Sequence, residues 1–204
     1  MKGLYLDTPD WDDTQKMLAA TEAGLRGGAA IVQYRHKTAS PELRREQASQ
    51  LLALCRRYGK PFIVNDFVEL CMELDADGIH VGGTDMSVAQ VRAAVGPSKI
   101  VGASCYGSME LARNAHAAGA SYVAFGGFYP SRVKKYEVST PPEIVAQAKK
   151  EIPVPNVVIG GMTQENSVPL VAQGADMVAA ISSVYFADDP EAAARAFVQL
   201  FAGR

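Results

Sequence analysis

Eight short apolar runs, rich in Val and Ile, alternate along the chain with longer stretches of helical character. The runs cover residues 3–6, 30–34, 61–64, 78–81, 99–103, 122–125, 156–159 and 177–180. They are continuously apolar, which is typical of parallel strands covered by helices. Eight strand–helix units are the number that closes a parallel sheet into a barrel. The pattern therefore predicts an α/β fold, a (β/α)8 TIM barrel, as a single domain over residues 1–204.

Residues that begin or end helices support this division. Asp12 or Asp13 is expected to cap a first helix over residues 13–25, which a glycine pair then ends. Ser40, followed by a proline and an acidic residue, begins a second helix that ends at Gly59.

The composition limits the kinds of partner. The chain has 204 residues, 48% of them hydrophobic, which is enough for one core but short against the roughly 250 residues typical of such barrels. With 20 basic and 22 acidic residues the net charge is −2, which argues against a nucleic-acid partner, so any anion site must be local.

Three cysteines, an odd number, indicate reduced thiols. Since no basic-then-apolar leader and no run of about 18 apolar residues appears, we expect a cytoplasmic protein without a membrane partner. The oligomeric state stays open, a homo-oligomer included.

Polar clusters follow the apolar runs, at the strand ends that form the active face of such barrels. After the second run, Arg35 and Lys37 alternate with His36, so both cations can point into the mouth while His36 points away. A guanidinium and an ammonium are suited to phosphate oxygens; the alternative is a solvated basic loop. Gln33, on the same face, could hold a ring nitrogen or an amine, or fill a layer of the barrel.

Two carboxylates follow the third and fourth runs. Asp66 and Asp85 end neighbouring strands, which lie about 4.8 Å apart, so the two side chains can share one hard cation. Mg²⁺ usually takes one or two carboxylates together with substrate phosphate oxygens and waters. The pair therefore fits a magnesium–diphosphate site, although each residue read alone is better explained as a helix cap. Asn65 could donate its amide to a phosphate oxygen or tie down a turn.

The last two strands end in groups suited to a second anion. Backbone N–H groups after strands seven and eight of such barrels frequently bind phosphate. Here these positions hold Gly160, Gly161, Ile181, Ser182 and Ser183, and the glycine pair could also be only a tight turn. The mouth is thus predicted to hold a diphosphate leaving group at its cationic side and a monophosphate at the other.

A long irregular segment over residues 126–140 is the candidate for a mobile lid. It contains Ser131, Arg132, Lys134 and Lys135.

Other chemistries find little support. His36, His80 and His116 have no zinc-ligand spacing with one another or with the cysteines. His80 lies within a strand and is better explained as a hydrogen-bonded histidine of the barrel. No Ser-His-Asp order or nucleophile elbow is present, and Cys105 has no evident base partner.

Taken together, these segments resemble the thiamine-phosphate synthase family in order and spacing, over nearly the whole chain. The segments that carry the resemblance are 34–37, 64–66, 77–82, 102–106, 119–134, 158–161 and 174–182. The resemblance implies a transferase that condenses 4-amino-2-methyl-5-(diphosphooxymethyl)pyrimidine with a thiazole phosphate, giving thiamine phosphate and pyrophosphate. It further implies a dissociative substitution through a pyrimidine carbocation, without a protein nucleophile.

The resemblance also implies a role for each matching position. The expected diphosphate ligands are Arg35, Lys37, Asn65 and Lys134. The expected magnesium ligands are Asp66 and Asp85, and Gln33 and Ser104 are expected at the pyrimidine. The thiazole phosphate is expected at Gly160, Gly161, Ile181 and Ser182. Ser131 keeps a hydroxyl where the family usually has threonine, whereas Val133 lacks one.

Two alternatives are weighed against this activity. One is a thiazole tautomerase of the same superfamily, which would lack the complete set of cations and carboxylates and carry a histidine near the end of the fifth strand, where Tyr106 is found here. The other is a non-catalytic protein that binds thiazole or thiamine phosphate, which would release no pyrophosphate.

Overall fold

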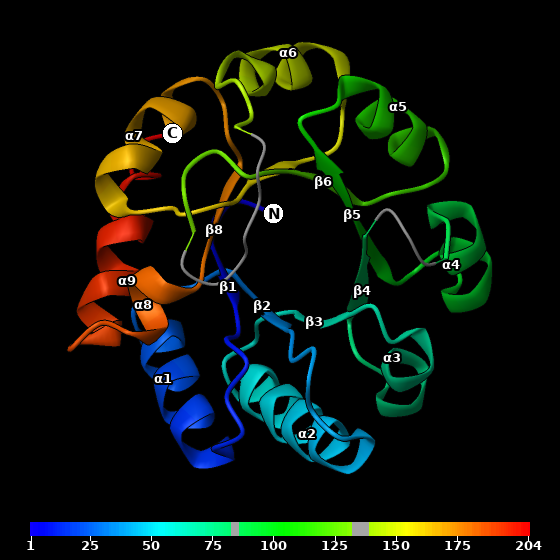
Figure 1. Cartoon of the computed structure of the whole chain (residues 1–204), viewed down its shortest axis with the longest axis vertical. Helices are drawn as coiled ribbons and strands as arrows, with labels where there is room; N and C mark the ends of the chain where they lie inside the picture. Colours follow the sequence, from blue (N-terminus) through cyan, green and yellow to red (C-terminus); the bar gives the residue numbers. More distant parts are fainter. Residues whose placement is uncertain (83–85, 132–138) are drawn as a thin grey trace.

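The structure, a computed structural model, describes residues 1–82, 86–131 and 139–204. Within these ranges eight parallel strands form a closed barrel in sequence order, and β8 pairs with β1 to complete the ring (Figure 1). The strands are β1 (Gly3–Asp7), β2 (Ile31–Tyr34), β3 (Phe62–Asn65), β4 (Gly78–Val81), β5 (Ile100–Tyr106), β6 (Tyr122–Phe125), β7 (Asn156–Val158) and β8 (Met177–Ala180). The predicted (β/α)8 barrel is confirmed.

Helices follow the strands and surround the barrel (Figure 1). They are α1 (Thr14–Arg26), α2 (Pro41–Arg57), α3 (Val68–Leu74), α4 (Val88–Val95), α5 (Met109–Ala117), α6 (Glu143–Glu151), α7 (Gln164–Ala172), α8 (Ser182–Tyr185) and α9 (Pro190–Gln199). None of the helices in the described ranges combines the length and the apolar character needed to cross a membrane.

The predicted helix starts are capped by side chains. Asp13 accepts a hydrogen bond from the backbone N–H of Lys16 at 2.9 Å, and Ser40 accepts one from Leu43 at 3.1 Å. Each cap satisfies a donor that the first helical turn leaves unpaired. These two contacts fix where α1 and α2 begin.

Two apolar layers stabilise the barrel. The larger layer lies between the outer face of the strands and the helices. The smaller layer fills the interior, because every second strand residue points inward. Its buried members are Tyr5, Ile31, Ile63, Tyr122, Ala124, Val157, Met177 and Ala179.

Strand β5 is longer than expected. It runs to Tyr106 rather than ending at residue 103, and its pairing with β6 shifts between Ser104 and Tyr106. Tyr106 has a positive φ of 51°. The polar residues that looked like the following loop still pair with a neighbour, and this irregularity aims them at the end of the barrel.

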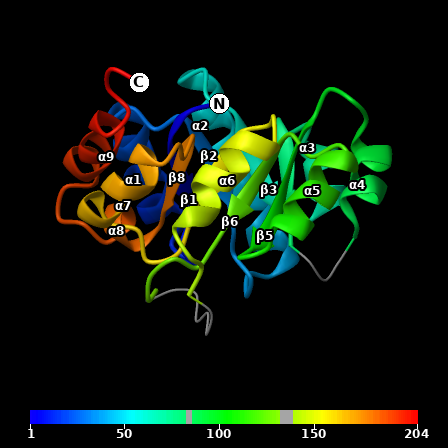
Figure 2. The same cartoon turned by 90° about the horizontal axis from the view of Figure 1, so that it is seen from above.

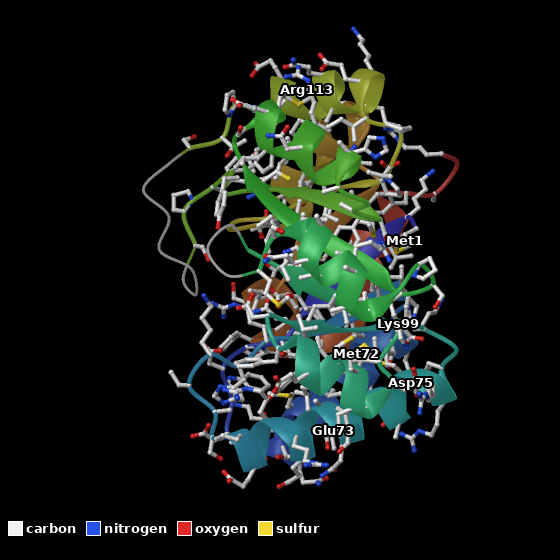
Figure 3. The ribbon with its side chains drawn as sticks, turned by 90° about the vertical axis from the view of Figure 1, so that its right-hand side faces the viewer. Met1, Met72, Glu73, Asp75, Lys99 and Arg113 are labelled. Carbon is white, nitrogen blue, oxygen red and sulfur yellow. The ribbon has the colours of Figure 1, made fainter. Side chains whose placement is uncertain are left out.

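The two ends of the barrel differ. Met1, Asp75 and Lys99 lie at the end where the strands begin (Figure 3), and both chain termini lie on the same side of the molecule (Figure 2). Asp75 and Lys99 form an ion pair there. The opposite end, where the strands finish, is the face on which such barrels place their active sites.

Candidate active site

A cavity of about 140 Å³ lies inside the barrel toward the carboxyl ends of the strands. Its wall takes residues from the strands and from the segments that follow them. The lining residues are Tyr5, Gln33, Arg35, Lys37, Asn65, Asp66, His80, Gly82, Ser104, Tyr106, Tyr122, Ala124, Val157, Ile159 and Ala179. Six residues expected at the site therefore lie around one cavity: Gln33, Arg35, Lys37, Asn65, Asp66 and Ser104.

Arg35 is the buried cation of this cavity. It is only 8% exposed, and its Nη1 makes no hydrogen bond within the described residues. Asp10, in the segment after β1, places Oδ1 3.5 Å from that nitrogen. Thr8 fixes the backbone, because its Oγ1 accepts a hydrogen bond from the N–H of Arg35 at 2.9 Å. The guanidinium is thus held in place with capacity left to bind an anion.

The alternation expected after β2 is present. Arg35 and Lys37 line the cavity, whereas His36 is buried outside it, with Nε2 2.8 Å from Oδ1 of Asp12. The backbone N–H of Lys37 donates to Oδ1 of Asp10 at 3.1 Å. The segment after β1 therefore anchors both cations, a partnership that the sequence pattern did not indicate.

The carboxylate of Asp66 stands where β3 ends. Its backbone is left-handed, with φ 65°, and its N–H donates to the carbonyl of His80 at 2.9 Å. Asn65 donates its amide to Oδ2 of Asp66 at 2.9 Å. Helix α3 begins after Phe67 without a side-chain cap, so Asp66 does not serve as the cap of that helix. Its backbone instead holds the carboxylate at the cavity wall.

One of the two expected magnesium ligands, Asp66, belongs to the described residues, whereas Asp85 lies outside them. Within residues 1–82, 86–131 and 139–204, no three His, Cys, Asp or Glu side chains gather closely enough to hold a metal. Helix α4 is capped by Ser87, which accepts a hydrogen bond from the N–H of Gln90 at 3.2 Å.

Three further residues of the cavity were not expected at the site. Tyr5, His80 and Tyr122 lie beside Gln33 and Ser104 in its wall. The imidazole of His80 lies between two hydroxyl groups. Its Nδ1 is 2.8 Å from the hydroxyl of Tyr122, and its Nε2 is 2.9 Å from that of Ser104. The sequence did contain a signal for these three residues, because alternate residues of a barrel strand point inward. A tyrosine within an apolar strand is, however, usually interpreted as a core residue.

A second, smaller hollow lies beside the cavity and shares two of its lining residues. It is lined by Ser131, Ile159, Gly160, Gly161, Met162, Ala179, Ile181 and Ser182. The four positions expected at the thiazole phosphate, Gly160, Gly161, Ile181 and Ser182, are therefore together, with Ser131 beside them. They adjoin the cationic cavity through Ile159 and Ala179.

The glycine pair is required by a close backbone approach. Gly160 and Gly161 have φ values of +112° and +60°. A Cβ on Gly161 would lie 2.2 Å from the carbonyl oxygen of Pro130, and one on Gly160 would lie 2.5 Å from the Cα of Gly127. The segment after β6 thus packs directly against the turn after β7, and only glycine fits both the space and the backbone.

The comparison with known proteins identifies the family. A family model described as thiamine monophosphate synthase matches residues 4–184. The chain belongs to the thiamine monophosphate synthase family. The thiamine-phosphate synthase of Janthinobacterium sp. (strain Marseille) is 67% identical over 202 residues, which cover 99% of this chain and 98% of that protein. The thiamine-phosphate synthase of Thiobacillus denitrificans is 47% identical over 200 residues, covering 98% and 95% respectively.

A solved structure supports the same assignment. The thiamine phosphate pyrophosphorylase from Pyrococcus furiosus superposes with a TM-score of 0.86 at 29% identity, covering 97% of this chain and 94% of that one. The expected family is confirmed, and membership of the thiamine monophosphate synthase family makes the chain a transferase of thiamine biosynthesis.

Part of the family pattern falls outside the described residues. Lys134, expected at the diphosphate, and Val133 lie there, as do the other basic residues of the predicted lid, Arg132 and Lys135. The lid therefore stays a prediction.

A pair of glycine variants tests the role of Gly161 in this family fold. Gly59 has nearly the same backbone, φ +62°, but open space around it. Gly59→Ala should lower the free energy of unfolding by about 1–2 kcal/mol, the usual cost of a left-handed alanine. Gly161→Ala should cost about 1–3 kcal/mol more, because its methyl group also meets the carbonyl of Pro130. Urea unfolding measures both; equal losses would show that the close approach is unimportant.

Cys105 is predicted to be chemically inert. It is fully buried, does not line the cavity, and burial raises the pKa of its thiol to about 12. Since the thiolate is the reactive form, iodoacetamide at pH 8 should leave the activity of the folded protein unchanged. After unfolding in urea, all three free cysteines should react. Rapid modification of Cys105 with loss of activity would contradict this prediction.

Proposed function

We propose that this protein condenses 4-amino-2-methyl-5-(diphosphooxymethyl)pyrimidine with a thiazole phosphate, releasing pyrophosphate and forming thiamine phosphate. The observation that carries the proposal is the single cavity that joins cationic, carboxylate and neutral polar groups in a chain of this family. The thiazole phosphate is assigned to the adjoining glycine-lined hollow. Two half-sites that share a wall suit a reaction that joins two small molecules.

The first step is the departure of the diphosphate from the pyrimidine. The pyrimidine amino group stabilises the carbocation that remains, while negative charge grows on the leaving oxygen. Arg35, Lys37 and the amide of Asn65 line the same cavity and are assigned to bind that charge. Because the charge is larger in the transition state than in the bound substrate, these contacts lower the barrier rather than only tightening binding.

Attack by the thiazole nitrogen completes the reaction. That nitrogen carries a lone pair and needs mainly to be held close to the cationic carbon. Gly160, Gly161 and Ser182 are assigned to the thiazole phosphate and would act as its anchor. No protein base is needed, because the product keeps the positive charge on the thiazolium nitrogen.

Mg²⁺ is the proposed cofactor, with Asp66 and Asp85 as its protein ligands. The donor set suits it, because a carboxylate at the cavity wall beside two cations leaves most coordination positions to diphosphate oxygens and water. The ion, when bound, would neutralise part of the diphosphate charge. The left-handed backbone of Asp66 and the amide of Asn65 orient the carboxylate before substrate arrives.

The expected setting is the cytoplasm, in keeping with three cysteines that are all free. The expected partners are the two small-molecule substrates, and the oligomeric state stays open.

A pyrophosphate-release assay with both substrates tests the function. Release should require both the pyrimidine diphosphate and Mg²⁺, and thiamine phosphate should form in equal amount. A protein that isomerises the thiazole without releasing pyrophosphate would be a tautomerase. Binding without turnover under any of these conditions would make it a carrier or sensor.

A further inference from the structure

A buried hydrogen-bonded network crosses the bottom of the cavity from Gln33 to Ser104. Nε2 of Gln33 donates to the hydroxyl of Tyr5 at 2.8 Å, and that hydroxyl lies 2.7 Å from the hydroxyl of Tyr122. The Tyr122 hydroxyl lies 2.8 Å from Nδ1 of His80, whose Nε2 lies 2.9 Å from Oγ of Ser104. The network therefore comprises five residues from five strands, and three of them connect the two side chains that are assigned to the pyrimidine.

The network is rigidly enclosed. Tyr5 is 1% exposed and Tyr122 is fully buried. A Cβ on Gly102 would lie 2.0 Å from the ring of Tyr122, so the ring occupies space that only a glycine leaves. Burial raises the pKa of both tyrosines, which therefore remain neutral and carry one proton each.

The hydroxyl and imidazole protons of the network have one favourable arrangement, in which each group donates to the next along the chain from Gln33 to Ser104. Because Gln33 donates to Tyr5, the Tyr5 hydroxyl must place its own proton elsewhere, and Tyr122 is its other hydrogen-bond partner within the described residues. Tyr122 then donates to Nδ1 of His80. The imidazole must carry its proton on Nε2, and it donates to Oγ of Ser104.

The reverse order is costly. If Nδ1 of His80 carried the proton, Tyr122 would donate to Tyr5, which already accepts from Gln33. The Tyr5 proton would then have no acceptor within the described residues. A buried donor without an acceptor loses its full solvation, so the order that starts at Gln33 is preferred.

We propose that Tyr5, Tyr122 and His80 are positioning residues that make the Ser104 hydroxyl a hydrogen-bond donor toward the ring nitrogen of an aminopyrimidine. Ser104 accepts from His80, so its own proton is left for the cavity. Gln33 donates one N–H to Tyr5, and its side-chain oxygen can accept from an exocyclic amino group. The identity of this ligand rests on the proposed function; the order of the protons does not.

The proposed donor and acceptor also explain a choice between substrates. A 4-aminopyrimidine offers an acceptor nitrogen beside a donor amino group, which matches the pair. The corresponding pyrimidinone offers a ring N–H and a carbonyl. It would therefore place a donor against the Ser104 hydroxyl proton and an acceptor against the Gln33 oxygen. We expect the network to favour the amino substrate over the oxo analogue.

The first test reads the histidine directly. The chain has three histidines, so ¹⁵N-histidine labelling and long-range proton–nitrogen NMR can resolve them, with His80→Gln used to assign His80. The expected spectrum of the native protein shows a protonated Nε2 and a bare Nδ1. A protonated Nδ1 would reverse the network and overturn the proposal. This measurement needs no substrate, and the variant serves only to assign the His80 signals.

The second test asks whether Tyr122 acts through Ser104. Tyr122→Phe and Ser104→Ala should each raise KM for the pyrimidine diphosphate about tenfold, the factor of one neutral hydrogen bond, with little change in KM for the thiazole phosphate. Because the two residues act in series, the double variant should lose no more than Ser104→Ala alone. Multiplied losses would mean that Tyr122 acts independently, and would overturn the proposal.

Tyr185→Phe is the matched control. The Tyr185 hydroxyl is also buried and lies 2.9 Å from another hydroxyl, that of Thr21, between α8 and α1. This variant should lose stability but change neither KM for the pyrimidine diphosphate nor the tautomer of His80. If Tyr185→Phe raised that KM as much as Tyr122→Phe does, the effect of Tyr122→Phe would be explained by general destabilisation. That result would overturn the proposal. If the native protein releases no pyrophosphate, the proposed function fails while the NMR test still decides the proton order.

Discussion

Asp66→Asn should reduce kcat by about two to three orders of magnitude, the usual size of a lost electrostatic contact at a reacting charge. Asparagine tolerates the left-handed backbone of this position, φ 65°, so the fold should be retained. The substitution removes the negative charge at the cavity wall and keeps the shape. We also expect the Mg²⁺ concentration for half-maximal activity to rise, because one proposed ligand becomes neutral. Pyrophosphate release over a magnesium titration measures both effects.

Asp75→Asn provides the control for this change. Asp75 has a similar backbone, φ 52°, but lies at the opposite end of the barrel, where it pairs with Lys99 (Figure 3). Its substitution should leave both kcat and the magnesium requirement unchanged. An Asp66→Asn protein with native magnesium dependence would remove Asp66 from the proposed metal site.

Arg35→Gln should also slow pyrophosphate release by about two to three orders of magnitude, because it removes a buried cation from the charge that develops on the leaving group. Arg35 is 8% exposed, and the segment after β1 contacts both its backbone and its guanidinium. Arg35→Lys keeps the charge but not the planar fork, so its loss should be intermediate. Single-turnover measurement of pyrophosphate release separates this chemical effect from substrate binding.

Arg113→Gln is the corresponding control. Arg113 pairs with Glu151 on the outer surface, between α5 and α6 (Figure 3). Losing this exposed pair should leave kcat at the native value, since surface ion pairs contribute little. Native pyrophosphate release by Arg35→Gln would assign the diphosphate to another part of the cavity.

The strands were predictable because their buried faces require continuous apolar runs. Strands β4, β6 and β8 begin and end where the pattern placed them. Strand β5 was cut short in the prediction because Ser104 and Tyr106 are polar, and hydrophobicity cannot report a polar residue that still pairs with a neighbouring strand. Pairing is a property of two segments, whereas the pattern describes one.

The site was predictable where a residue follows its strand directly. Arg35 and Asp66 closely follow apolar runs, and a charged residue at such a position can be identified from the sequence alone. Tyr5 and Tyr122 are separated by 117 positions and meet only because the barrel closes. Asp10 belongs to a loop whose course no local pattern specifies, so its contacts with the cationic segment could be found only in three dimensions.

Both termini sit away from the mouth of the barrel (Figures 2 and 3). The last helix, α9, returns toward the end where β1 begins, so a fusion partner or an affinity tag at either extremity would project from the far side. The protein can therefore be immobilised on a support by its first or last residues with its substrate entrance facing the solution. Turnover on such a support should match that of the freely diffusing protein.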